Sequence, residues 1–225
     1  MALSKLLDLS GKTAIVTGGA AGIGLGIVNR LAEAGANVVI ANIDKVKGEE
    51  AAANLVKNGL KVKSVATDVS KEEDVKSMVE FAVKTFGGVD ILVNNAGIYP
   101  NIPLEKMTAA DFDKVIAVNL RGVFLCTKYC ADQMIKQGKG GKIINVTSID
   151  ALHPSSVGLA HYDASKHGAW GFTKNAALEY SQHKIWINAI APGYIKTPGT
   201  EIFQEQMKAA GMDPKPMMDA MTAKI

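Results

Sequence analysis

Cysteine is scarce in this chain. Cys126 and Cys130, four residues apart, are the two cysteines among 225 residues. The sequence around them holds no histidine or cysteine cluster that would complete a zinc site, and it lacks the C-x-x-C spacing of redox pairs. The pattern therefore favours two small buried apolar side chains over a metal fragment or a redox pair. No metal site is expected.

Long apolar runs are also missing. No stretch approaches the roughly 18 residues that a membrane-spanning helix needs. At the amino end, Lys5 and Asp8 interrupt the sequence before the apolar region of a signal peptide could form. We therefore expect a cytoplasmic protein that does not enter a membrane.

Charge of one sign is scarce as well. The formal net charge is only +3, and the lysines are interspersed with acidic residues. Because no basic stripe or polybasic run stands out, neither nucleic acid nor an anionic membrane surface is predicted as a partner. Apolar residues make up 48% of the chain, which is typical of a globular protein with a sizeable core.

Short β-branched runs alternate with longer helical patterns along most of the chain. Strands are predicted at 12–17, 37–42, 61–66, 89–93, 142–146 and 185–190. Helices are predicted at 22–34, 46–57, 71–86, 109–136 and 161–181. Such alternation predicts an α/β fold, a doubly wound Rossmann-type parallel sheet with helices on both faces. No linker divides the chain, so residues 1–225 are expected to form a single domain.

The carboxyl-terminal segment differs from the rest. After Pro192-Gly193 the periodicity fades, and five of the nine methionines lie in the last nineteen residues, at Met207, Met212, Met217, Met218 and Met221. Methionine adapts to irregular apolar surfaces. We therefore expect residues 194–225 to form a lid over a substrate, with a loosely packed terminal helix as the alternative.

A glycine-rich turn joins the first predicted strand to the first predicted helix. Its spacing, over Thr17–Gly24, is G-x3-G-x-G. Glycine permits a sharp turn and lets the backbone approach a pyrophosphate, while the helix start offers free N–H groups and a partial positive charge. The position of this turn between a strand and an amphipathic helix indicates a dinucleotide site.

Tyr162 and Lys166 stand four residues apart on a predicted helix and therefore share one face. A phenol that exchanges protons near neutral pH needs a neighbouring cation, because its ordinary pKa is about 10. The same spacing also occurs on ordinary helices, so the surrounding motifs decide its meaning.

Four motifs in order resemble the short-chain dehydrogenase/reductase family. Thr17–Gly24 resembles its TGxxxGxG turn, Asn94–Gly97 its NNAG motif, Asn188–Gly193 its N-x-x-x-P-G stretch, and Tyr162–Lys166 its Y-x-x-x-K pair. The resemblance implies an NAD(P)-dependent oxidoreductase that interconverts a secondary alcohol and a ketone. Sugars, polyols, steroid-like alcohols and 3-oxoacyl thioesters all stay open as substrates. The competing interpretation is a cofactor-binding protein with little turnover, in a regulatory or assembly role.

The resemblance also implies four catalytic positions. Tyr162 is the general acid/base, and Ser148 hydrogen-bonds the substrate oxygen. Lys166 lowers the pKa of Tyr162 and contacts the nicotinamide ribose, and Asn119 binds a water that completes a proton relay. Asparagine is a poor residue for a helix interior, which gives Asn119 independent interest.

Further residues are predicted to contact the cofactor. They are Gly18, Gly22, Ile23, Gly24, Asn42, Asp44, Asp68, Val69, Asn95, Ala96, Gly97, Tyr162, Lys166, Pro192, Gly193, Ile195 and Thr197. The alternative for Asp68 is an ordinary turn before a helix.

The choice of dinucleotide is expected at the end of the second strand. An acid there would bind the ribose of NAD, but the family's acidic position falls on Asn42, with Asp44 two residues later. Ala20 and Ala21 supply no base for a 2′-phosphate, and Lys45 is the one nearby candidate. The sequence therefore leans to NAD over NADP.

Other expectations concern the pocket and the assembly. His153 and Tyr194 are candidates to contact the substrate, with His161 as a further possibility. The helices at 109–136 and 161–181 are apolar over more than one stripe, which favours a homodimer or homotetramer. The family usually continues beyond Ile225 with another helix and a seventh strand, so we expect a truncated chain that lacks part of the pocket wall.

Overall fold

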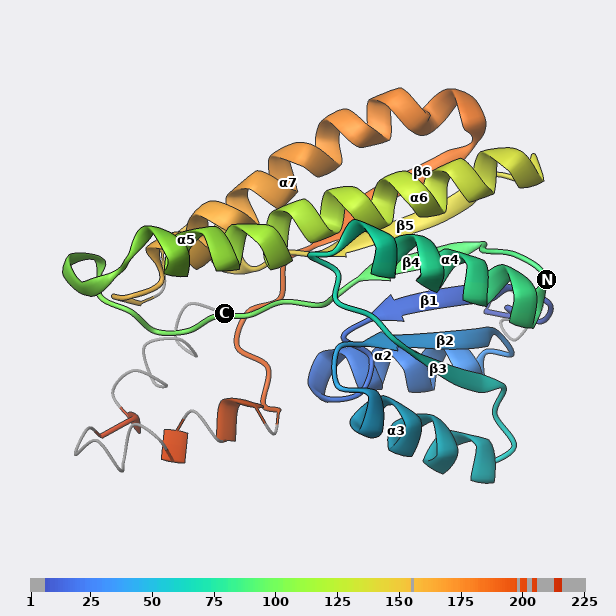
Figure 1. The fold of residues 1–225 in the computed structure, drawn as a ribbon, viewed down its shortest axis with the longest axis horizontal. Coiled ribbons are helices and arrows are strands. Elements are labelled where there is room, and N and C mark those ends of the chain that lie inside the picture. Colours follow the sequence, from blue (N-terminus) through green and yellow to red (C-terminus); the bar gives the residue numbers. More distant parts are fainter. Residues whose placement is uncertain (1–6, 155, 198, 202–203, 206–212, 216–225) are drawn as a thin grey trace.

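The computed structural model describes residues 7–154, 156–197, 199–201, 204–205 and 213–215. Figure 1 shows a central sheet with helices on both sides. Among the described helices, none combines the length and apolar composition needed to cross a bilayer. The predicted α/β class and doubly wound sheet are confirmed.

Six parallel strands form the sheet, in the order β3-β2-β1-β4-β5-β6. The strands are β1 (Thr13–Thr17), β2 (Asn37–Asn42), β3 (Val62–Ala66), β4 (Ile91–Asn94), β5 (Gly141–Val146) and β6 (Ile185–Ile190). Val16 on β1 pairs with Ile40 on β2 and with Val93 on β4. The strands β2 and β3 are therefore added on one side of β1 and the strands β4 to β6 on the other, so the strand order reverses between β1 and β4. A ligand in such a sheet binds beyond the carboxyl ends of the strands, at this switch point.

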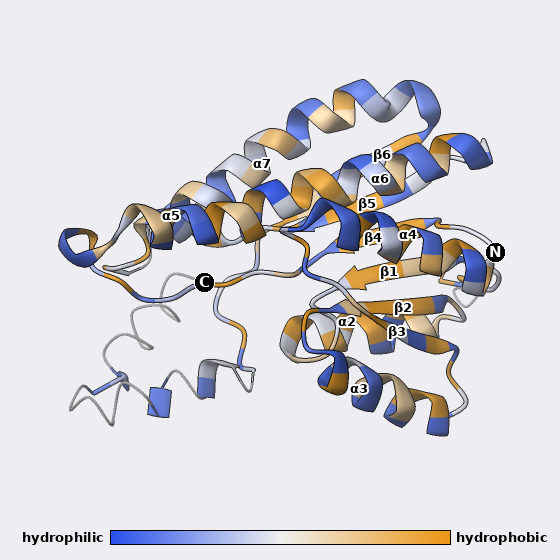
Figure 2. Cartoon of the chain, in the orientation of Figure 1, coloured by the Kyte–Doolittle hydropathy of each residue, from blue (hydrophilic) through white to orange (hydrophobic). Residues whose placement is uncertain are grey.

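Two apolar cores fix the helices to the sheet. The helices are α2 (Gly22–Glu33), α3 (Lys45–Lys57), α4 (Glu72–Phe86), α5 (Ala109–Ile116), α6 (Gly122–Gln137) and α7 (Ala160–Tyr180). One core joins α2 and α3 to residues such as Val16 and Ile40, and the other joins α4, α6 and α7 to residues such as Ile15 and Leu92. Alternate side chains of β1 therefore point to opposite cores. The apolar strands between more polar helix surfaces are visible in Figure 2.

The predicted helix at 109–136 is not continuous. A π-helical turn, η2 (Ala117–Arg121), lies between α5 and α6 and contains the buried Asn119. Single π turns often occur at functional sites, because they re-aim one side chain out of the regular ladder. The sequence pattern does not reveal this turn, since the apolar period continues through it.

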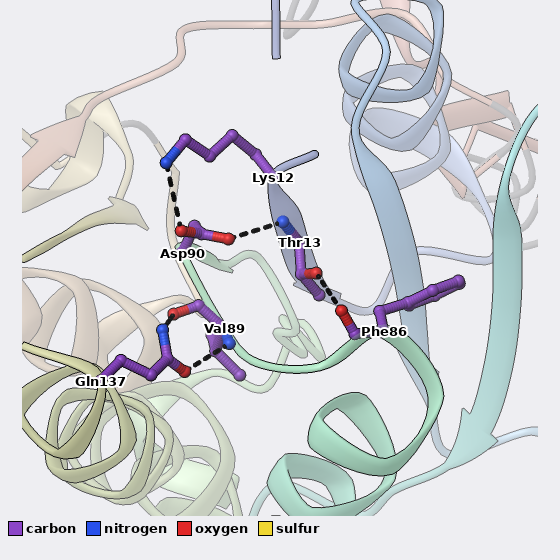
Figure 3. Close-up of polar contacts among 6 residues, drawn as sticks. All are labelled: Lys12, Thr13, Phe86, Val89, Asp90 and Gln137. Carbon is purple, nitrogen blue, oxygen red and sulfur yellow. Dashed lines mark hydrogen bonds and ion pairs between the residues drawn. The ribbon is translucent and has the colours of Figure 1, made fainter. Parts of the chain in front are cut away.

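Hydrogen bonds hold the amino ends of β1 and β4 together (Figure 3). The Asp90 carboxylate accepts from the Thr13 backbone N–H at 2.9 Å and lies 3.4 Å from the Lys12 ammonium. The Gln137 side chain binds both backbone groups of Val89, at 2.8 and 2.9 Å. These contacts anchor α6 at the end of the sheet opposite to the one where the predicted site residues gather.

Candidate active site

The carboxyl ends of the strands open into one large cavity of about 550 Å³. The loops after β1, β2, β3, β4, β5 and β6 all contribute to its lining. Most of the predicted cofactor contacts line it: Gly18, Gly22, Ile23, Gly24, Asn42, Asp68, Val69, Asn95, Ala96, Gly97, Pro192, Gly193, Ile195 and Thr197. Ser148, Tyr162, Lys166 and Tyr194 line it too. Segments far apart in the sequence therefore meet at one site.

The glycine-rich turn is closely packed. Gly18 and Gly22 have φ of 64° and 53°, in the region where glycine is favoured. A Cβ on Gly24 would stand 2.2 Å from the Gly18 carbonyl oxygen, so no larger residue fits there without moving the backbone. The helix α2 begins at this turn with no side-chain cap, which leaves its first N–H groups directed at the cavity edge. This turn therefore fits a pyrophosphate group.

Asn95 ties this turn to the end of β4. Its Nδ2 donates to the carbonyl oxygens of Thr17 and Gly18, at 2.9 and 3.2 Å. In return, the Thr17 hydroxyl accepts from the backbone N–H groups of Asn95 and Ala96, both at 3.0 Å. Two loops separated by more than 70 residues are thus held as one rigid unit.

Two predicted contacts near β2 and β3 differ in their surroundings. Asp44 is not among the lining residues, because its carboxylate caps α3 by accepting from the Lys47 N–H at 3.1 Å. Its predicted cofactor contact is therefore not supported by the structure. Asp68 does line the cavity, and its Oδ1 also accepts from the N–H and hydroxyl of Ser70, so it takes part in a turn before α4 while its cofactor contact stays a prediction.

Ser148, Tyr162 and Lys166 meet at the carboxyl end of β5. Ser148 follows β5 and caps the short helix η3 (Ile149–Ala151). Tyr162 and Lys166 lie on the first turns of α7, and the Lys166 ammonium lies 5.6 Å from the centre of the Tyr162 ring. Lys166 is buried and donates to the carbonyl oxygen of Val146 at 2.8 Å. The predicted pair thus shares one face, next to the predicted serine.

The proton affinities of this pair differ from the sequence-based expectation. Burial raises the pKa of Tyr162 to about 12, against a smaller lowering by the Ser148 hydroxyl. Burial also lowers the pKa of Lys166 to about 8. The expected lowering of the Tyr162 pKa by Lys166 is therefore not found, because the ammonium is directed at the Val146 carbonyl and burial of the phenol dominates.

Asn119 lies behind the cavity wall and is fully buried. Its Oδ1 accepts from the Ile98 N–H at 2.8 Å, and its Nδ2 donates to the Ile98 carbonyl at 2.8 Å and to the Ser165 hydroxyl at 3.1 Å. A Cβ on Gly97 would stand 3.4 Å from Asn119 Oδ1 and 3.6 Å from Lys166 Nζ. The π turn therefore brings Asn119 beside Lys166 and the loop after β4.

Several further residues that line the cavity were not singled out by the sequence patterns. They include Tyr99, Asn101, Asp150, Leu159, Gln204 and Pro214. The Tyr99 and Tyr162 rings meet edge to face at 6.1 Å, and Gln204 donates to the Tyr194 hydroxyl at 2.9 Å. These positions follow from loop packing and have no local motif. The methionines of the proposed lid lie outside the described residues.

Neither of the two histidines considered for the substrate pocket lines the cavity. His153 is exposed and is not among the lining residues, so its predicted substrate contact is not supported. His161 is fully buried, and its Nδ1 accepts from the Tyr162 N–H at 2.9 Å. It lies buried in the first turn of α7 and is not among the residues that line the cavity.

Both cysteines lie on the core side of α6 and are fully buried, as predicted. Burial raises the pKa of Cys126 to about 12, and burial also raises that of Cys130. Such thiols react poorly, because the thiolate is the nucleophile. Within the described part of the chain, no group of three or more histidine, cysteine or acidic residues is placed to hold a metal ion.

Comparison with known proteins gives the family. The family described as short chain dehydrogenase matches residues 12–208. The short chain dehydrogenase/reductase astE of Aspergillus oryzae is 41% identical over 89% of this chain and 77% of its own length. The D-beta-hydroxybutyrate dehydrogenase of Cupriavidus necator is 42% identical over 89% of this chain and 76% of its own length.

A solved structure shows the same likeness in three dimensions. A short-chain type dehydrogenase/reductase from Mycobacterium marinum superposes with a TM-score of 0.86 at 32% identity, over 92% of this chain and 83% of that one. Sequence motifs, sheet order and overall structure agree. The chain therefore belongs to the short-chain dehydrogenase/reductase family and is an oxidoreductase of the NAD(P)-dependent kind.

Proposed function

We propose that this protein interconverts a secondary alcohol and a ketone, with Tyr162 as the general acid/base. The observation that carries the proposal is the meeting of Ser148, Tyr162 and Lys166 in one cavity with a glycine turn that fits a pyrophosphate. A bound nicotinamide dinucleotide would accept or supply the hydride. The related hydroxybutyrate dehydrogenase is named for a substrate of this alcohol class, which supports the proposal.

The chain's own groups handle the proton and the substrate oxygen. In alcohol oxidation, the Tyr162 oxygen takes the hydroxyl proton, and in ketone reduction it returns one. The Ser148 hydroxyl holds the substrate oxygen. Because burial raises the Tyr162 pKa to about 12, the phenol is protonated at neutral pH, which suits it to act as an acid toward a ketone. Oxidation requires additional positive charge near the phenol to stabilise the phenolate.

Asn119 and Lys166 support this centre from behind. Asn119 holds the loop after β4 through both backbone groups of Ile98, and Ser165 links it to the Tyr162 carbonyl, to which the Ser165 hydroxyl donates at 2.7 Å. Lys166 is held by the Val146 carbonyl at the end of β5. In our proposal, these contacts keep Tyr162 in one position relative to Ser148.

NAD is the dinucleotide that the proposal favours. Asn42 lines the cavity, and its Nδ2 donates to the Asp44 carbonyl at 3.0 Å. With Nδ2 bound in this way, Asn42 Oδ1 can accept from a ribose 2′-hydroxyl, whereas the neutral amide offers no positive charge to a 2′-phosphate. Lys45, the nearby cation, is not among the lining residues, and its ammonium lies 3.9 Å from Glu49. The sites of Asn42 and Lys45 thus suit a free 2′-hydroxyl.

The test of the reaction is a panel of alcohols and ketones, followed by absorbance of the reduced nicotinamide at 340 nm. Wild-type protein should turn over at least one secondary alcohol or its ketone. In Tyr162→Phe, kcat should fall by about 100-fold or more, which is the usual contribution of a general acid or base. Dinucleotide affinity should be retained in Tyr162→Phe. Unchanged turnover in this variant would refute the mechanism, and absence of turnover with retained dinucleotide binding would favour a binding role.

The test of the dinucleotide compares the dissociation constants of NAD and NADP for the wild type and Asn42→Asp. The acid should weaken NADP binding further, because a carboxylate repels the 2′-phosphate. Tighter NADP than NAD binding by the wild type would contradict the NAD assignment.

Self-association is part of the proposal. Phe124 on α6 contacts Phe172 on α7 edge to face at 6.3 Å, yet 43% of Phe124 is exposed, and Leu178 on α7 is 73% exposed. Burial of such side chains against a second copy would remove apolar surface from water. Light scattering should give the mass of a dimer or tetramer, and a monomer at micromolar concentration would contradict this.

A further inference from the structure

A carboxylate lies directly beside the reacting hydroxyls, and the proposed mechanism does not use it. Asp150 in η3 lines the cavity with only 9% of its surface exposed. Its Oδ2 accepts the hydroxyl proton of Ser148 at 2.9 Å, and its backbone N–H donates to the Ser148 oxygen at 3.2 Å. The Ser148 hydroxyl is thus held at both its proton and one lone pair, and its one proton has to turn from Asp150 to the substrate oxygen for the proposed reaction.

Asp150 also interacts with a second carboxyl group. Its Oδ1 is buried and has no hydrogen-bond partner among the described residues, and the same is true of Asp163 Oδ1 on α7. Burial and then the negative charge of Asp150 raise the pKa of Asp163 to about 6. The charge of Asp150 contributes to the high pKa of Tyr162 as well. The buried carboxylate of Asp150 therefore raises the pKa of both Asp163 and Tyr162.

Two basic side chains near Asp150 contact backbone carbonyl oxygens instead of its carboxylate. The Lys166 ammonium donates to the Val146 carbonyl, and the His167 ring Nδ1 lies 2.7 Å from the Ala151 carbonyl oxygen. A substrate in the cavity next to Ser148 therefore interacts with the negative charge of Asp150. Repulsion between like charges is stronger beside a buried carboxylate than in bulk water, because the effective dielectric constant is lower.

We propose that Asp150 is a positioning and specificity residue, which holds the Ser148 hydroxyl and makes the pocket select uncharged alcohols over hydroxy-acid anions. The inference rests on the proposed function and names the substrate class of the same site. It separates two roles of one side chain: the hydrogen bond positions Ser148, and the charge selects the substrate.

The experiment compares 3-hydroxybutanamide with 3-hydroxybutyrate, two molecules of nearly equal shape that differ in charge. For the wild type, kcat/KM of oxidation should favour the amide by about tenfold or more. Where turnover is too slow, the inhibition constants of the two compounds against another alcohol substrate replace kcat/KM. Asp150→Asn keeps an acceptor for the Ser148 proton and removes the charge, so the preference should fall to within about threefold.

Two further variants separate the roles. Asp150→Ala removes the hydrogen bond and should lower kcat for the amide by about tenfold, whereas Asp150→Asn should keep it within about threefold. Asp163→Asn removes the neighbouring charge without touching Ser148 and should leave the substrate preference in place. In Asp150→Asn, the rising limb of the pH–rate profile of oxidation should also move to lower pH, since less negative charge opposes ionisation of Tyr162.

A measurement without turnover tests the charge itself. Carboxyl ¹³C NMR, assigned with Asp163→Asn, should show that the Asp163 pKa falls in Asp150→Asn. An unchanged Asp163 titration would overturn the claim that Asp150 carries a negative charge. Equal kcat/KM for the anion and the amide in the wild type would overturn the claim that this charge selects the substrate, and so would an unchanged preference in Asp150→Asn. Absence of turnover with every alcohol tested would instead count against the proposed function, and with it the selection.

Discussion

Removal of the Asn119 side chain should destabilise the protein more than its small size suggests. Asn119 is fully buried in the π turn and makes three hydrogen bonds, two with Ile98 and one with Ser165. A typical hydrogen bond contributes about 1 kcal/mol net, so Asn119→Ala should lower the free energy of unfolding by about 3 kcal/mol. That is a large share of the roughly 5–15 kcal/mol that stabilises a domain.

Urea denaturation followed by circular dichroism measures this loss. Asn101→Ala is the matched control, because Asn101 is exposed and its Nδ2 makes one bond, to the Val157 carbonyl at 2.8 Å. It should cost about 1 kcal/mol or less. Asn119→Leu fills the space but leaves Ile98 without its partners, so it separates the polar loss from the cavity. A loss below about 1 kcal/mol in both Asn119 variants would refute the reasoning that the π turn is held by these bonds.

Two other predictions follow from burial and close packing. Gly24→Ala should lower stability by about 1–3 kcal/mol and weaken dinucleotide binding, since its Cβ would meet the Gly18 carbonyl oxygen. Gly26→Ala, on the same helix with nothing within 4 Å of its Cβ, should stabilise by about 0.5–1 kcal/mol, and equal thermal shifts in the two variants would contradict this. Burial lowers the Lys166 pKa to about 8, below its ordinary 10.5, so between these values the unfolded chain binds more protons and stability rises with pH. Between pH 7 and pH 10, the free energy of unfolding of the wild type should therefore rise by up to about 3 kcal/mol relative to that of Lys166→Met. Parallel pH profiles of the urea midpoints of the two proteins would show that Lys166 is not buried as a cation.

Local patterns were enough to predict the fold class and most strand and helix ranges. β-Branched runs and the 3.6-residue apolar period depend on near neighbours in the sequence, and so does the chemistry of a glycine turn. The predicted helix at 109–136 shows the limit of such patterns. Its apolar period continues through η2 (Ala117–Arg121), and the turn exists because Asn119 finds partners in the loop after β4.

The sequence by itself determined the parallel α/β architecture, the glycine turn and the order of motifs that bring Ser148, Tyr162 and Lys166 to one end of the sheet. Tertiary structure alone decided that His153 lies outside the cavity and that Asn119 binds both backbone groups of Ile98 in the loop after β4. It also decided the proton affinity of Tyr162, because burial by distant segments outweighs a lysine four residues away. Contacts and desolvation depend on what packs around a residue, and a local pattern carries no record of that.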